Sequence, residues 1–153
     1  MKRIAKALML FALVASQAAL AGPKEDAIAA YMKFFQAFTP DNHDMIVTLF
    51  APDAQFFGTL STDAVTETEG IRKYFVSALN SSRGTVAARP FEQTATVISD
   101  GVVLVAGKWQ SERTLDGKMT TAGPSRNTVV MQKRGDRWLI VQFHNSPTPK
   151  PSE

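Results

Sequence analysis

The chain contains no cysteine and only two histidines, His43 and His144. Without cysteine there can be no disulfide framework, no thiol nucleophile and no thiolate metal site, so stability must come from a packed core. The two histidines are far apart in the sequence and lack the spacing of metal ligands. We therefore expect no metal site, and no motif indicates a cofactor.

A net positive charge is also missing from most of the chain. There are 17 basic and 14 acidic residues, but Lys2, Arg3 and Lys6 lie in the first 21 residues, which contain no acid. The remainder carries 14 charges of each sign. Binding to nucleic acid or to a membrane surface requires clustered excess Lys and Arg, so we expect neither partner.

The one long apolar run lies at the N-terminus. It follows the basic residues 2–6, covers about residues 7–15 and leads to Ala19-Leu20-Ala21. A membrane anchor is the alternative interpretation, but the run is barely long enough to span, is rich in alanine and ends in small residues. We predict a signal peptide at 1–21, cleaved before Gly22, and a periplasmic or secreted protein with no stable membrane insertion.

Beyond residue 21, the apolar residues recur first mainly with the spacing of helices and then with the spacing of strands. Helical spacing predicts helices at 24–38 and about 43–50, and a third that begins after residues 66–69. A short strand at 54–57 is followed by strands at about 86–97, 102–114, 119–133 and 137–144, joined by turns that contain Asp-Gly or Gly-Asp. This order predicts an α+β fold in which a curved antiparallel sheet is closed by about three N-terminal helices around a pocket.

Four segments carry a family resemblance: FFGTLS (56–61), GIRKYF (70–75), SRNTVVM (125–131) and WLIVQFHNSPTP (138–149). In order and spacing they resemble the SnoaL-like members of the nuclear transport factor 2-like superfamily, and in particular bacterial relatives of the association (hub) domain of calcium/calmodulin-dependent protein kinase II. The resemblance implies a cone-shaped domain, here 22–146, followed by a proline-rich tail at 147–153. The superfamily contains enzymes, binding modules and assembly domains, so fold alone does not give the reaction.

Strand alternation sorts the candidate pocket residues. On the last strand, Leu139, Val141, Phe143 and Asn145 form the more apolar face, which we place inside the cone. On the preceding strand the same alternation, carried through the resemblance, places Asn127, Val129 and Met131 inside. The resemblance implies arginines in the hub cavity that bind small carboxylates, but the matching positions here are Gln110, Val129 and Asn145. We therefore expect a small neutral or weakly polar ligand, with a pocket formed by Phe35, Phe57, Tyr74, Gln110, Asn127 and Asn145.

The other face of the sheet has no predicted helix to cover it. The same alternation places on this outer face a set of apolar and basic residues that we predict to form a homodimer interface, because exposed apolar patches of this kind usually mark interfaces. The set is Trp109, Arg126, Val130, Trp138, Ile140 and His144. His144 and Arg126 have an alternative interpretation as a polar acid/base site.

Two functions remain open at this stage. The first is a secreted or periplasmic homodimerising module of the association-domain type that binds a small molecule and is not catalytic. The alternative is a small enzyme of the polyketide-cyclase or ketosteroid-isomerase kind, with Tyr74 and a carboxylate or His144 in acid/base roles. The strands expected to line the cone offer no clearly inward Asp or Glu, which favours the first and leaves no firm catalytic residue.

Overall fold

A computed structural model describes residues 22–149 of the chain. The predicted signal peptide at 1–21 and the end of the predicted tail, 150–153, lie outside the described residues. Within the described part, no helix has the length and apolarity needed to cross a membrane.

Three α-helices and one short 3-10 helix precede the long strands. They are α1 (Pro23–Ala37), α2 (His43–Val47), α3 (Thr68–Ala78) and η1 (Ser81–Arg83). The first helix begins with a proline and two acids, which suit a helix N-terminus. Its buried residues Tyr31, Phe34, Phe35 and Phe38 recur three and four positions apart, so they form one aromatic stripe that packs against the sheet.

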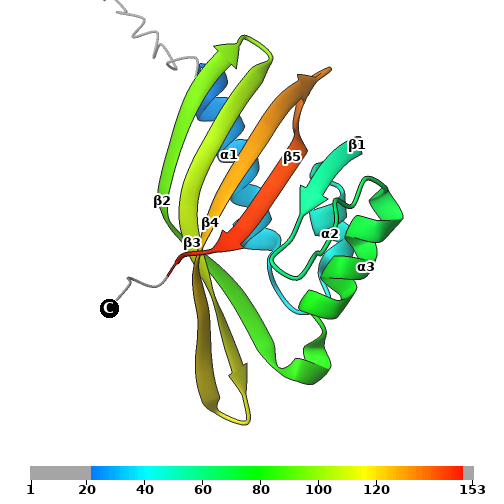
Figure 1. Cartoon of the computed structure of the whole chain (residues 1–153), viewed down its shortest axis with the longest axis vertical. Helices are drawn as coiled ribbons and strands as arrows, with labels where there is room; N and C mark the ends of the chain where they lie inside the picture. The colour runs from blue at the N-terminus through cyan, green and yellow to red at the C-terminus, as the bar shows by residue number, and fades with distance from the viewer. Residues whose placement is uncertain (1–21, 150–153) are drawn as a thin grey trace, which may run out of the picture.

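Five strands form a single sheet: β1 (Phe50–Phe57), β2 (Thr85–Ser99), β3 (Val102–Leu115), β4 (Lys118–Arg134) and β5 (Arg137–Pro147). Their spatial order is β1-β5-β4-β3-β2. The four long strands are antiparallel as predicted, whereas β1 is parallel to β5. Figure 1 shows α1 lying across one face of this sheet, with α2 and α3 beside β1. The predicted α+β cone is confirmed.

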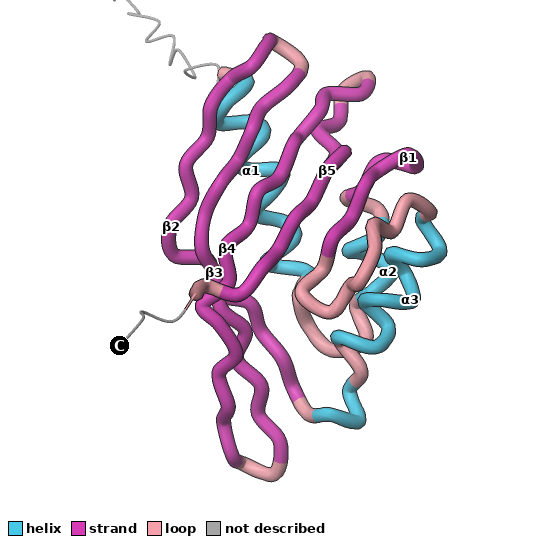
Figure 2. Tube along the Cα trace, in the orientation of Figure 1, coloured by secondary structure: helices cyan, strands magenta, loops and turns pink. Residues whose placement is uncertain are grey.

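The β3–β4 hairpin extends beyond the body of the sheet. Figure 2 shows its turn at the far end of a two-stranded arm. The register between the strands shifts where the arm begins, between Trp109 and Ser111. Thr148 donates its backbone N–H to the carbonyl oxygen of Pro124 at 3.0 Å, so the start of the predicted tail is held against β4.

A β-bulge in β5 changes which residues of that strand face the helices. Val130 pairs with Gln142, but the next residue, Met131, pairs with Ile140, so Val141 is an extra residue. Downstream of the bulge Phe143 and Asn145 are buried as predicted; upstream, Ile140 is buried and pairs with the buried Met131, while Leu139 is only partly buried and pairs with Gln132. The predicted placement of Leu139 inside and of Trp138 and Ile140 outside is therefore wrong.

The assignment of the two faces of β3 is also wrong. Val103, Val105 and Trp109 are the buried, inward residues, so Gln110 lies on the opposite face. On β4 the predicted inner set, Asn127, Val129 and Met131, is buried, as expected. Because antiparallel partners share a face, the pairing of Val105 with Val129 fixes this assignment for both strands.

Candidate functional site

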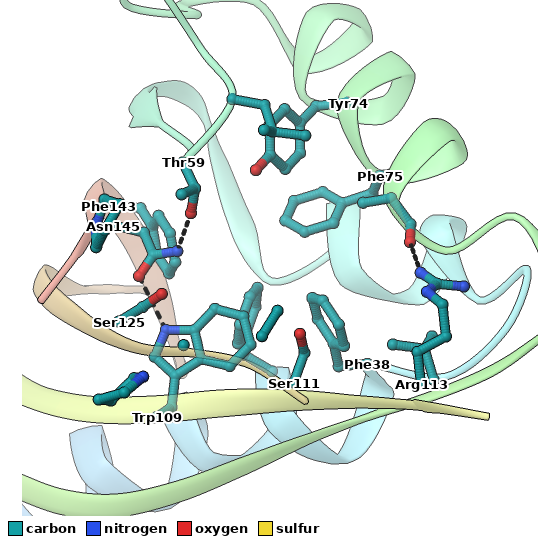
Figure 3. A pocket seen from close by; sticks show the side chains of 18 of the residues that line it. Phe38, Thr59, Tyr74, Phe75, Trp109, Ser111, Arg113, Ser125, Phe143 and Asn145 are labelled. Carbon is teal, nitrogen blue, oxygen red and sulfur yellow. Dashed lines mark hydrogen bonds between the residues drawn. The ribbon is translucent and has the colours of Figure 1, made fainter. Parts of the chain in front are cut away.

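A cavity of about 800 Å³ opens between the helices, the inner face of the sheet and the base of the β3–β4 arm. Aromatic side chains form much of its wall: Phe34 comes from α1, Phe38 follows that helix directly, Phe75 comes from α3, and Trp109 and Phe143 come from the sheet. Figure 3 shows the rings of Phe38, Phe75, Trp109 and Phe143 around the space together with several polar groups. An apolar cavity with few fixed polar groups is the usual form of a small-molecule site.

Asn145 is a polar group of the cavity that two side-chain hydrogen bonds hold in place. Its Oδ1 accepts a hydrogen bond from the Trp109 indole Nε1 at 2.9 Å, and its Nδ2 donates to the Thr59 hydroxyl at 2.5 Å (Figure 3). These two bonds orient the amide, which is buried. The chain of groups links β3, β5 and the loop after β1, so it also fixes that loop beside the cavity.

Tyr74 reaches the cavity from α3 because the chain makes room for its ring at Gly58. A Cβ atom added to Gly58 would collide with the ring and the hydroxyl of Tyr74. Burial raises the pKa of the Tyr74 hydroxyl, and hydrogen bonding by the Leu60 backbone and by Thr59 offsets part of the rise. The hydroxyl is therefore protonated at neutral pH and can donate a hydrogen bond to a ligand.

Two arginines line another part of the cavity wall. Arg113, on β3, donates from Nη2 to the carbonyl oxygen of Ala78 at 2.7 Å and from Nη1 to that of Arg83 at 3.1 Å. Figure 3 shows Arg113 on the opposite side of the cavity from Asn145. Arg83 follows α3 and also lines the cavity. Burial, and then the neighbouring Arg83 charge, lower the pKa of Arg113.

The family model described as a SnoaL-like domain matches residues 28–150, which is most of the chain. The chain belongs to the SnoaL-like family. Its five-stranded curved sheet with N-terminal helices is the cone of nuclear transport factor 2-like proteins. No curated protein sequence matches the chain.

Solved structures agree with this fold. A protein described as a calcium/calmodulin-dependent protein kinase II association domain, from Xanthomonas campestris, is 25% identical with a TM-score of 0.73; the match covers 83% of this chain and 89% of that one. The association domain of C. elegans calcium/calmodulin-dependent protein kinase II is 18% identical with a TM-score of 0.65, covering 79% and 92%. A protein described as a scytalone dehydratase, from Novosphingobium aromaticivorans, is 8% identical with a TM-score of 0.70, covering 81% and 83%.

The sequence-predicted pocket residues of this SnoaL-like domain are only partly brought together. Tyr74 and Asn145 line the cavity. Phe35 is buried in the core against Trp109, with ring centroids 5.9 Å apart, and does not reach the cavity. Phe57 is exposed on the outer face, because alternation along β1 gives the inward position to Phe56.

The remaining two predicted pocket residues also lie elsewhere. Gln110 is on the outer face of β3, as the register shows. Asn127 faces inward and is only 3% exposed, but it does not line the cavity. Neither atom of its amide has a hydrogen-bond partner in the described structure, so it is a buried polar group outside the cavity.

The predicted interface residues of the domain also separate into two sets. Arg126 and His144 are exposed, and Val130 is partly buried on the same outer face. Trp109, Ile140 and Trp138 lie on the inner face, where Trp109 and Ile140 are buried and Trp138 packs against the core. Of the predicted interface set, only Arg126, Val130 and His144 therefore lie on the outer face, where Val130 pairs with Leu104 of β3.

Sequence reasoning missed Trp109, Arg83 and Arg113 as cavity residues. A signal for Trp109 was present, because the odd-numbered positions of β3 from 103 to 109 contain no charge, whereas the even set includes Lys108. No comparable signal existed for the arginines. Arg113 lies where β3 extends into the arm and Arg83 in the η1 turn, so only the tertiary structure brings them together.

The described cavity wall contains no Asp or Glu. His144 is exposed on the outer face, beside Phe57 at a ring-centroid distance of 5.9 Å. The cyclase-like or isomerase-like alternative is therefore not favoured, since Tyr74 has no acid/base partner there. Across residues 22–149 no group of three His, Cys, Asp or Glu side chains could hold a metal ion.

Proposed function

We propose that this SnoaL-like protein is a secreted or periplasmic module of the association-domain type, which binds a small molecule in its cavity and forms a homodimer without catalysing a reaction. One observation carries the binding role: the cavity of about 800 Å³ is lined by aromatic rings and by an amide already oriented by two hydrogen bonds. Such preorganisation lowers the cost of ordering the site when a ligand binds.

The outer face of the sheet supports the homodimer. Leu104 and Val130 are paired across β3 and β4 and lie outside the core cluster, with Arg126 exposed further along β4. No described helix covers this face. A self-complementary contact between two copies would bury the apolar pair and leave the charged residues at the rim.

A single preparation can test both roles. Native mass spectrometry of the protein purified from its producing cells should give a dimer mass and a retained small molecule. A monomer mass at micromolar concentration would refute the dimer. Absence of any retained molecule, together with no change in Trp109 fluorescence during titration with 4-phenyl-1-butanol, would refute the binding role; Trp109→Phe serves as the control for the origin of the signal.

Export is tested separately. The basic start, apolar run and Ala-Leu-Ala end at 19–21 lead us to expect a mature chain that begins at Gly22. Intact-mass measurement of the periplasmic or secreted fraction decides this. A protein in that fraction that still begins at Met1 would contradict the proposal.

A further inference from the structure

The cavity has a positive end. Arg113 is half-buried and Arg83 is exposed, and both line the wall formed by the base of the arm and the end of α3. Two backbone carbonyl oxygens hold the Arg113 guanidinium, one of them on Ala78, the last residue of α3. The other is on Arg83 itself, so the two arginines are direct neighbours on this wall.

No carboxylate balances these charges. Neither arginine forms an ion pair with any described Asp or Glu. Asp116 lines a second hollow with both arginines, but it shares that hollow with Lys118. Carbonyl oxygens satisfy two of the five donors of a guanidinium and supply only partial negative charge, so positive charge remains on the wall.

We propose that Arg113 and Arg83 form an anion subsite and that the ligand is an amphipathic carboxylic acid with an aromatic or alkyl body. The inference deepens the proposed binding function and rests on it. It departs from the neutral ligand expected from the sequence, because that expectation considered Gln110, Val129 and Asn145, of which only Asn145 lines the cavity.

The arrangement of the lining explains why both parts of such a ligand are needed. A guanidinium fixed by two bonds presents its remaining donors in a set geometry, which suits a planar carboxylate. Ser111, two residues before Arg113 on the same face of β3, adds a hydroxyl to the wall. Phe38, Phe75 and Trp109 supply apolar area for the body, and the volume is far larger than a carboxylate alone would fill.

The test compares two probes that differ only in the head group, 4-phenylbutanoate and 4-phenyl-1-butanol, by calorimetric titration of the full mature protein. We expect the acid to bind about tenfold more tightly, the scale of one charge-assisted hydrogen bond. Added sodium chloride should weaken binding of the acid and leave the alcohol unchanged. Acetate, which lacks the body, should bind far more weakly than 4-phenylbutanoate.

Arg113→Gln should abolish the preference for the acid. Arg137→Gln is the control and should keep the preference, because Arg137 also donates to a backbone carbonyl oxygen, that of Thr48, but does not line the cavity. If Arg113→Gln does not fold, Arg83→Gln, an exposed position, should still reduce the preference. Equal affinity for alcohol and acid, or a preference that persists in the arginine variants, would overturn the anion subsite and leave the binding role intact. Binding of neither probe would overturn both.

Discussion

Trp109 donates its indole N–H to the side-chain oxygen of Asn145 at 2.9 Å, although the two residues lie on β3 and β5 with β4 between them. The bond crosses the inner face of the sheet at the cavity wall, and the same amide donates to Thr59 in the loop after β1. One hydrogen-bonded chain therefore joins three segments that are distant in sequence, and it determines the shape of the cavity at that side.

Asn145→Leu should lower the free energy of unfolding by about 1–3 kcal/mol, because it leaves the buried Trp109 donor without an acceptor. Urea denaturation measures the change. In the Trp109→Phe background the same substitution should cost clearly less, since the donor is gone. Equal costs in both backgrounds would mean that the bond contributes nothing to stability.

Gly58→Ala should destabilise the fold by about 1–3 kcal/mol, because the added methyl group overlaps the ring of Tyr74. Thermal or urea unfolding checks this. With Tyr74→Leu as the starting protein, the smaller side chain should remove most of the penalty. A full penalty in that background would point to the Gly58 backbone rather than to the tyrosine.

Leu104→Arg should shift the protein from dimer to monomer, because it places a charge in the apolar centre of the proposed outer-face patch. Light scattering after size-exclusion chromatography reports the mass. Trp138→Ala is the contrasting variant: its side chain packs against the core, so it should reduce stability and leave the mass at that of the dimer. Dissociation by Trp138→Ala but not by Leu104→Arg would reverse the assignment of the two faces.

Stability should fall as pH rises above about 10, because the two tyrosines of the chain then ionise more readily in the unfolded than in the folded protein. Burial raises the pKa of both Tyr31 and Tyr74 in the folded protein, so the neutral form is favoured there relative to the unfolded chain. The stability that follows from keeping both hydroxyls neutral is therefore fully present below pH 10.0, the pKa of tyrosine in the unfolded chain, and is lost as pH rises above it. Tyrosinate absorbance should appear together with unfolding, whereas ionisation in a folded protein near pH 10 would contradict the burial.

At acid pH, the Asp53–Arg134 pair should affect stability. The hydrogen bond from Arg134 lowers the pKa of Asp53 in the folded protein below the 3.8 of the unfolded chain, so the stability that Asp53 contributes is lost as pH falls below 3.8. The pair is bidentate, at 2.7 and 2.9 Å, and joins β1 to the β4–β5 hairpin. Asp53→Asn should flatten the loss of stability between pH 5 and pH 3. Asp136→Asn, on the adjacent turn and without a described ion pair, is the matched control for removing one surface carboxylate.

The sequence alone determined the elements and their order. The aromatic stripe of α1 has a clear 3.6-residue period, and Asp-Gly marks the turns at 100–101 and 116–117, so α1 and the long hairpins were predicted close to their bounds. The second helix is shorter than the predicted 43–50, because β1 begins at Phe50 rather than at the predicted residue 54. The inner face of β4 was also predicted correctly: alternation together with the family resemblance placed Asn127, Val129 and Met131 inside, and all three are buried. Local patterns of this kind depend only on residues near each other in the chain.

Tertiary structure decided which residues meet at the cavity. The bulge at Val141 reverses the faces of β5 upstream of it. In β3 the residues at positions 102–105 are all apolar, so alternation in that stretch does not distinguish the faces, and Lys108 is the only charged residue between 102 and 110 that marks one of them as outer. Arg113 reaches the cavity wall because the arm of β3 meets the end of α3, where Arg113 contacts Ala78, 35 positions earlier in the chain. Register and long-range packing set these positions, and neither is encoded in a local period.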